Sequence, residues 1–151
     1  MKVSNTRRRH NAGFSLIEIL VVMVIIGILV SLVAPSVLNR VDDARLQKVE
    51  ADFKAIESAL SIYNLDNFTY PSTDQGLQAL VSKPDGQPEA RNWKKGGYLK
   101  EMPLDPWGRE YLYLSPGENG REFDLYTLGA DGVSGGEDQN ADMFSGDNAQ
   151  Q

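Results

Sequence analysis

The sequence contains no cysteine, and His10 is its only histidine. Without cysteine the chain can form no disulfide, no Cys/His nucleophilic pair and no Cys/His zinc site, although this absence is compatible with any compartment. The segments GENG (117–120) and GADG (129–132) are not followed by Lys-Ser or Lys-Thr, so neither is a phosphate-binding loop. Paired carboxylates in the C-terminal tail define no cleft for hydrolysis. We therefore expect that the chain is not an enzyme.

Basic residues are outnumbered. The 151 residues include 15 Lys and Arg against 21 Asp and Glu, which gives a formal net charge of -6. Nucleic-acid binding needs a basic surface, so we expect no nucleic-acid partner. The basic residues Lys2, Arg7, Arg8 and Arg9 nevertheless lie before Gly13, where there is no acidic residue.

Residues 19–38 carry no formal charge. A helix of roughly 20 such residues matches the hydrocarbon core of a bilayer. The preceding arginines place the N-terminus on the cytoplasmic side by the positive-inside rule. A secretory signal peptide is the alternative, but the apolar run is longer than usual and Ala34 is a poor cleavage site, with Leu32 two places before it and Pro35 directly after it.

Glu18 lies about one turn inside the apolar run. Ionisable groups in such segments are rare and are usually functional, so a plain membrane anchor does not explain this carboxylate. Snorkelling of Glu18 to the membrane interface remains an alternative. Pro35 removes one backbone donor and predicts a local kink, either at the membrane exit or with a more special role.

The helical pattern continues beyond residue 38 as one narrow apolar stripe, with charged residues on the other faces. The stripe consists of Val49, Phe53, Ile56, Leu60 and Tyr63. We predict a single helix over residues 14–64. Its first half faces lipid or like helices, and its second half packs under a soluble head.

The rest of the chain predicts a small antiparallel sheet. The alternating segments at residues 109–115 and 122–128 are strand-like, and PGENG (116–120) between them is typical of a hairpin turn. A short helix is expected over residues 75–81, with Leu77, Leu80 and Val81 inward, and residues 82–108 are rich in Pro and Gly. The predicted class is α+β, with a long helix packed on a small sheet.

An acidic, glycine-rich loop follows the second predicted strand. Asp131, Glu137, Asp138 and Asp142 lie there among several glycines. Oxygen ligands on a tightly curled loop are what calcium prefers, although the spacing is not that of an EF-hand. A solvated acidic tail is the alternative, since such composition is common in disordered termini.

The segment GFSLIEILVVMVIIGILVSLVAP (13–35) resembles the N-terminal signal of type IV pilin-like proteins, with a short basic leader, a Gly13–Phe14 junction and Glu18 at the fifth position after it. Four downstream segments resemble the major pseudopilins of type II secretion systems: YNLDNFTYPSTDQGLQAL (63–80), GGYL (96–99), DPWGREY (105–111) and YTLGADGVSGGED (126–138). The final MFSGDNAQQ (143–151) departs from the IGNW-like ending that is common in that family.

This resemblance implies three parts: a cleaved leader (1–13), a transmembrane and assembly helix (14–38) and a soluble periplasmic head (39–151). A prepilin peptidase would cut after Gly13 and methylate the amine of Phe14. Subunits held in the inner membrane, with a cytoplasmic N-terminus, would then assemble into a helical pseudopilus that drives the export of folded proteins. Minor pseudopilins and the inner-membrane secretion platform are the implied partners.

The resemblance also implies residue roles. Calcium would bind in the C-terminal loop, and the implied ligands are the carbonyls of Leu128 and Val133 and the carboxylates of Asp131, Asp138 and Asp142.

The implied assembly residues are Phe14, Glu18 and Pro35. An unpaired carboxylate is costly in a filament core, so Glu18 would pair with the Phe14 amine of a neighbouring subunit.

Two other functions remain as alternatives. One is a membrane-anchored periplasmic binding protein that depends on calcium. The other is a type IV pilin proper, although such pilins usually carry a C-terminal disulfide loop and this chain has no cysteine.

Overall fold

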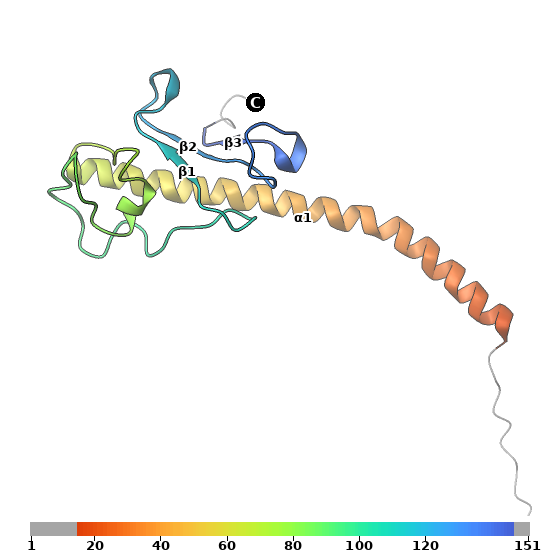
Figure 1. The fold of residues 1–151 in the computed structure, drawn as a ribbon. Helices are drawn as coiled ribbons and strands as arrows, with labels where there is room; N and C mark the ends of the chain where they lie inside the picture. Colours follow the sequence, from red (N-terminus) through yellow and green to blue (C-terminus); the bar gives the residue numbers. More distant parts are fainter. Residues whose placement is uncertain (1–14, 147–151) are drawn as a thin grey trace, which may run out of the picture. The chain divides into compact units, whose positions relative to one another are not determined.

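The computed structural model describes residues 15–146, and for residues 32–39 and Asn119 it describes the backbone alone. One long helix, α1 (Leu16–Asn67), confirms the predicted single helix (Figure 1). Pro35 lies inside its range. The chain forms two compact units, Met1–Val41 and Asp42–Gln151. Among the residues that the structure describes, no helix combines the length and the apolar character needed to cross a membrane.

Helix α1 ends three residues later than predicted, at Asn67 instead of Asn64. The amide of Asn67 donates a 3.0 Å hydrogen bond to the carbonyl of Tyr63, and the N–H of Phe68 donates one of 2.7 Å to the carbonyl of Asn64. Phe68 then adopts a φ of 62° and turns the chain away. The side chain of Asn67 and the N–H of Phe68 therefore satisfy two of the last carbonyls of the helix.

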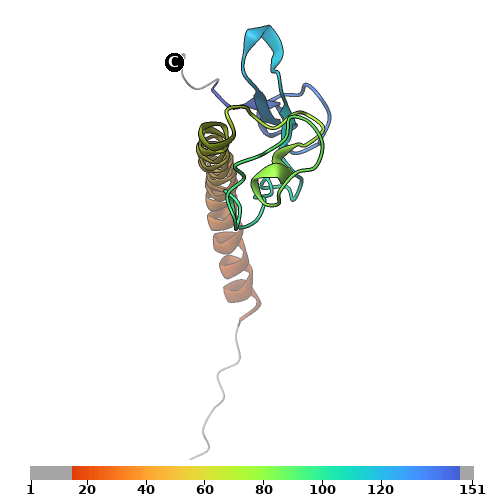
Figure 2. The same cartoon turned by 90° about the vertical axis from the view of Figure 1, so that its left-hand side faces the viewer.

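The predicted apolar stripe of α1 is the centre of the core. All five of its residues are buried: Val49, Phe53, Ile56, Leu60 and Tyr63. They pack in one cluster with Leu80, Tyr111, Tyr113 and Leu125 from the head. Burial of each large apolar side chain stabilises the fold by about 1.5–3 kcal/mol. Figure 2 shows the head on one side of this part of α1.

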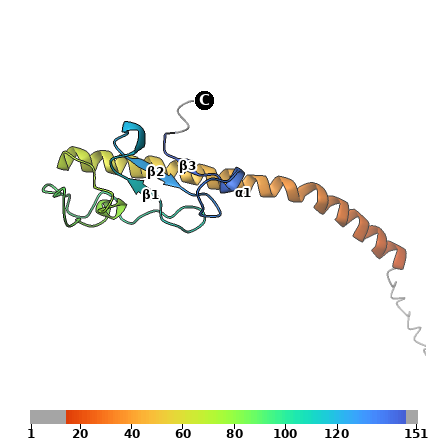
Figure 3. The ribbon, with the colours of Figure 1, turned by 45° about the horizontal axis from the view of Figure 1, so that its top comes forward.

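The head contains a three-stranded antiparallel sheet in the order β1-β2-β3 (Figure 3). β1 (Leu112–Leu114) and β2 (Asp124–Thr127) confirm the two predicted strands but are shorter. Leu112 pairs with Tyr126, and Tyr126 pairs with Phe144 of the third strand. That strand, β3 (Met143–Phe144), was not predicted, because two residues are too few to show alternation.

The hairpin between β1 and β2 confirms the predicted turn. It contains a short 3₁₀ helix, η2 (Glu118–Gly120). The buried carboxylate of Asp124 accepts a 2.8 Å hydrogen bond from the N–H of Glu118 and forms a 2.9 Å ion pair with Arg121. One β2 side chain therefore holds the turn closed.

The predicted helix over residues 75–81 is shorter than expected. It is a single 3₁₀ turn, η1 (Leu77–Leu80), preceded by Gly76 at a φ of 57°. Leu77 and Leu80 face inward as predicted, and Val81 is half-buried. Residues 82–108, which are rich in Pro and Gly, form no helix or strand, and an isolated bridge pairs Leu104 with Glu110. A third 3₁₀ turn, η3 (Asp138–Asn140), precedes β3.

Candidate functional site

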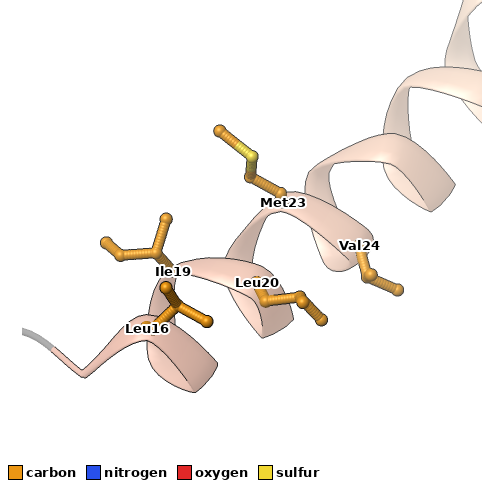
Figure 4. Close-up of a pocket in the computed structure, with 5 residues that line it drawn as sticks. All are labelled: Leu16, Ile19, Leu20, Met23 and Val24. Carbon is orange, nitrogen blue, oxygen red and sulfur yellow. The ribbon is translucent and has the colours of Figure 1, made fainter.

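The start of α1 presents an apolar surface. Leu16, Ile19, Leu20, Met23 and Val24 line a shallow open hollow (Figure 4). Every described apolar side chain from Leu16 to Val30 is exposed. Such a continuous exposed apolar surface marks a site of protein or membrane interaction.

Glu18 is the only charged residue of this surface, and it is exposed in the first turn of α1. Its N–H donates a 3.0 Å hydrogen bond to the carbonyl of Ser15. A carboxylate in the first turn is favoured by the helix dipole. The predicted processing residues Gly13 and Phe14 lie outside the described residues, and of Pro35 only the backbone is described.

The acidic loop, defined here as residues 128–142, leaves the end of β2 and returns to β3. Two backbone hydrogen bonds close it: the N–H of Gly132 to the carbonyl of Leu128 at 3.2 Å, and the N–H of Ala130 to the carbonyl of Gln139 at 2.7 Å. Gly129 has a φ of 61°, and a Cβ added there would lie 2.7 Å from the carbonyl oxygen of Ala141. The close approach of the two arms therefore requires glycine at this position.

Four of the predicted calcium ligands lie in the first arm and the η3 turn. Oδ1 of Asp131 accepts a 3.0 Å hydrogen bond from the N–H of Val133, whose side chain is 64% exposed. Asp138 is exposed and opens η3 with a φ of 54°. The carbonyl of Leu128 receives the N–H of Gly132 and keeps a second lone pair.

Asp142 has the most informative surroundings of the predicted ligands. Its Oδ2 accepts hydrogen bonds from the N–H of Gly135 at 2.9 Å and from the hydroxyl of Ser134 at 3.2 Å. Its Oδ1 is buried and makes no hydrogen bond. A buried carboxylate oxygen without a partner is costly, and a cation would satisfy it.

The carboxylates of the acidic loop do not gather around one point in the described structure. Within residues 15–146, no three His, Cys, Asp or Glu side chains form a group that could hold a metal ion. A cation in this loop would therefore need backbone carbonyls beside the carboxylates. That donor set, hard oxygens on a flexible loop, is one that calcium accepts.

Sequence reasoning missed the residues that support the start of the loop. Asp105 is 3% exposed, and its Oδ2 accepts a 2.8 Å hydrogen bond from the hydroxyl of Thr127, the last residue of β2. Its Oδ1 accepts hydrogen bonds from the N–H groups of Trp107 and Arg109, at 3.0 and 2.8 Å. The guanidinium of Arg109 in turn donates to the carbonyl of Gly129. The DPWGRE motif (105–110) thus holds the acidic loop, whereas in the sequence it was only part of a segment that resembles major pseudopilins.

The structure contains the expected long helix packed on a small antiparallel sheet. The N-terminal segment in addition matches a known family. Residues 8–34 match the family described as the prokaryotic N-terminal methylation motif. These features resemble those of pilin-like proteins.

Residues 36–146 match the family described as type II secretion system, protein G. The chain is 57% identical to the type II secretion system core protein G of Pseudomonas aeruginosa over 94% of this chain and 99% of that protein. It is 53% identical to the protein of the same name from Vibrio cholerae, over 91% and 92% of the two chains. The chain belongs to the protein G family of type II secretion systems.

A solved structure supports the same family. The crystal structure of the major pseudopilin from the type 2 secretion system of enterohaemorrhagic Escherichia coli matches with a TM-score of 0.63 and 46% identity. The match covers 72% of this chain and 91% of that one. The fold described above is therefore the fold of a major pseudopilin.

Proposed function

We propose that this chain is the major structural subunit of the type II secretion pseudopilus, a helical filament that drives the export of folded proteins across the outer membrane. The observation that supports it best is the match of both parts of the chain, residues 8–34 to the N-terminal methylation motif and residues 36–146 to protein G. Minor pseudopilins and the inner-membrane secretion platform are the expected partners.

The N-terminus would be processed before assembly. A prepilin peptidase would remove residues 1–13 and methylate the amine of Phe14. Mass analysis of the N-terminus of the purified protein tests this: a methylated Phe14 is expected. An intact leader in a host with an active peptidase would contradict it and would favour an anchored binding protein that stays a monomer.

Before assembly, residues 14–38 would hold the subunit in the inner membrane, with its N-terminus in the cytoplasm and its head in the periplasm. The absence of charge over residues 19–38 and the basic cluster before Gly13 support this placement. The exposed apolar side chains from Leu16 to Val30 give such a helix a surface for lipid, and later for neighbouring subunits.

Glu18 would direct assembly. In a filament core of low dielectric its carboxylate would pair with the Phe14 amine of a neighbouring subunit. Subunits stacked in the wrong register would leave both charges unpaired, and this cost is larger than the stabilisation from the pair in the right register. We expect Glu18→Ala to be processed normally and to lose filament growth, whereas the control Glu101→Ala, an exposed carboxylate of the head, should keep both. N-terminal mass analysis and electron microscopy of sheared filaments measure the two effects. Normal filaments from Glu18→Ala would reject the pairing.

The acidic loop would hold a calcium ion. The carbonyls of Leu128 and Val133 and the carboxylates of Asp131, Asp138 and Asp142 would supply the oxygens, and the unpartnered Oδ1 of Asp142 supports the proposal. The ion would offset the repulsion between these carboxylates and so stabilise the loop.

A further inference from the structure

The side chain of Gln139 joins the acidic loop to the stalk, which we define as the part of α1 from Asp42 to Asn67. Its Nε2 donates a 2.6 Å hydrogen bond to Oδ2 of Asp42, and its Oε1 accepts one of 3.1 Å from Nη1 of Arg45. The same Nη1 forms a 3.2 Å ion pair with Oδ1 of Asp42. The three side chains form a closed ring of contacts between parts of the chain that are more than ninety residues apart.

The backbone of Gln139 holds the other arm of the loop. Its carbonyl accepts the 2.7 Å hydrogen bond from Ala130. A Cβ added to Gly129 would lie 2.8 Å from that same carbonyl oxygen. One residue therefore contacts the first arm through its main chain and the stalk through its side chain.

Gln139 also differs from its neighbours in exposure. Within residues 131–140 only Gly132 and Gln139 are half-buried, and all the other residues are exposed. Gln139 is therefore the one position in this range whose side chain is partly covered. Gln139 follows Asp138 directly in η3. A shift of η3 that brings Asp138 toward a cation would therefore also move Gln139 relative to the stalk.

The chemistry of the carboxamide suits this position. It donates to a carboxylate and accepts from a guanidinium at the same time, so both bonds are charge-assisted. A Glu side chain would face the carboxylate of Asp42 with like charge, and an Ala side chain would leave the Asp42–Arg45 pair without its link to the loop.

We propose that Gln139 is a positioning residue that couples cation binding in the acidic loop to the first turn of the stalk. The proposal rests on the calcium site proposed above. Calcium in the loop would order the stalk at Asp42 and Arg45, and by linkage the stalk contact would raise the affinity of the loop for calcium by the same factor.

The test uses the full chain in detergent, with calcium ions as the probe. Calorimetry measures the calcium affinity, and hydrogen exchange measures protection of the stalk peptide over residues 42–49. In wild type, calcium should slow exchange in this peptide. Gln139→Ala should bind calcium about tenfold more weakly, a usual size for coupling between sites, and should lose the calcium effect on residues 42–49. Gln47→Ala, an exposed glutamine of the same helix, is the matched control and should behave as wild type.

A second variant separates coupling from local damage to the loop. Asp42→Ala leaves the loop sequence intact, yet it should weaken calcium binding to a similar extent. Because both variants break the same contact, the double variant should lose little more than either single one.

The outcomes distinguish the two proposals. If wild type binds calcium and both Gln139→Ala and Asp42→Ala bind it equally well, the coupling is rejected and the calcium site stands. If wild type binds no calcium, the calcium site itself is rejected, and the coupling with it.

Discussion

The hydroxyl of Tyr111 donates a 2.7 Å hydrogen bond to Oδ2 of Asp52, and so joins the residue before β1 to the stalk. The same oxygen accepts a 2.5 Å contact from Nζ of Lys48, which also reaches the carbonyl of Leu104 at 2.5 Å. The ring of Tyr111 packs edge-on against Phe53, with 5.4 Å between the centroids. Polar and apolar contacts therefore fix the head on the stalk at one place.

Removal of the Tyr111 hydroxyl should destabilise the head. Tyr111→Phe keeps the packing against Phe53 but leaves Asp52 with Lys48 alone, and a hydrogen bond to a charged group contributes about 1.5–3 kcal/mol. We expect a lower melting temperature in thermal unfolding followed by near-ultraviolet circular dichroism. The matched control is Tyr126→Phe, a half-buried tyrosine whose ring stacks on Phe144. Equal melting temperatures for the two variants would contradict the proposed role of the bond.

Alkaline pH should unfold the head. Burial raises the pKa of Tyr113 to about 12, and burial followed by the hydrogen bond to Asp52 raises the pKa of Tyr111 well above its usual value. The unfolded chain releases these protons near the ordinary pKa of 10.0. The contribution of these two protonated hydroxyls to the free energy of unfolding is therefore fully present below pH 10. It falls as the pH rises from 10 toward 12, because the folded state binds more protons than the unfolded state there.

Phenolate absorbance at 295 nm and circular dichroism measure this alkaline transition. Part of the phenolate signal should appear together with the loss of native dichroism. Tyr113→Phe should lose less stability than wild type over the same range. Half ionisation of all six tyrosines near pH 10, with a native dichroism spectrum, would show that Tyr111 and Tyr113 are not protected.

Two isoleucines of α1 should differ strongly in their contribution to stability. Ile56 is 0% exposed in the core, whereas Ile62 is 47% exposed. Ile56→Ala should cost about 2–5 kcal/mol through lost burial and the cavity left behind. Ile62→Ala should cost less than about 1 kcal/mol. Thermal unfolding of the two variants gives the comparison, and similar losses of stability would mean that Ile62 is also buried in the folded protein.

Removal of calcium should lower the melting temperature of the wild-type head. A ligand that binds the folded state at 100 times its Kd stabilises it by about 2.7 kcal/mol. Melting in excess calcium and in excess chelator should therefore differ for wild type and should coincide for Asp131→Ala. Asp74→Ala, an exposed carboxylate outside the loop, should keep the difference. Identical melting temperatures of wild type in both conditions would reject the calcium site.

The parts of the fold that were predicted correctly follow from short periods in the sequence. The spacing from Val49 to Tyr63 identified both the helix and its buried face, since a helical face repeats every three to four residues. Alternation identified β1 and β2. Both strands are shorter than predicted, because the pairing covers only Leu112–Leu114 and Asp124–Thr127. β3 was missed, and η1 was predicted as a longer helix than it is. Such short elements depend on contacts with neighbouring elements and not on a local sequence pattern.

The candidate site divides in the same way. Composition alone singled out the acidic loop and its carboxylates, because hard oxygen ligands among glycines are visible in the sequence. Asp105, Arg109 and Gln139 showed no such pattern. Their roles depend on hydrogen bonds to Thr127, to Gly129 and to Asp42, and these partners are far away along the chain.

The sequence by itself determined the apolar helix with its basic leader, the misplaced charge of Glu18, the apolar stripe and the acidic loop, because each of these is a property of neighbouring residues. The tertiary structure alone decided which carboxylate oxygen of Asp142 has no partner, which residue holds the start of the loop, and that Gln139 contacts the stalk. The physical reason is that hydrogen bonds act over about 3 Å in space. Only folding brings residues that are tens of positions apart within that distance.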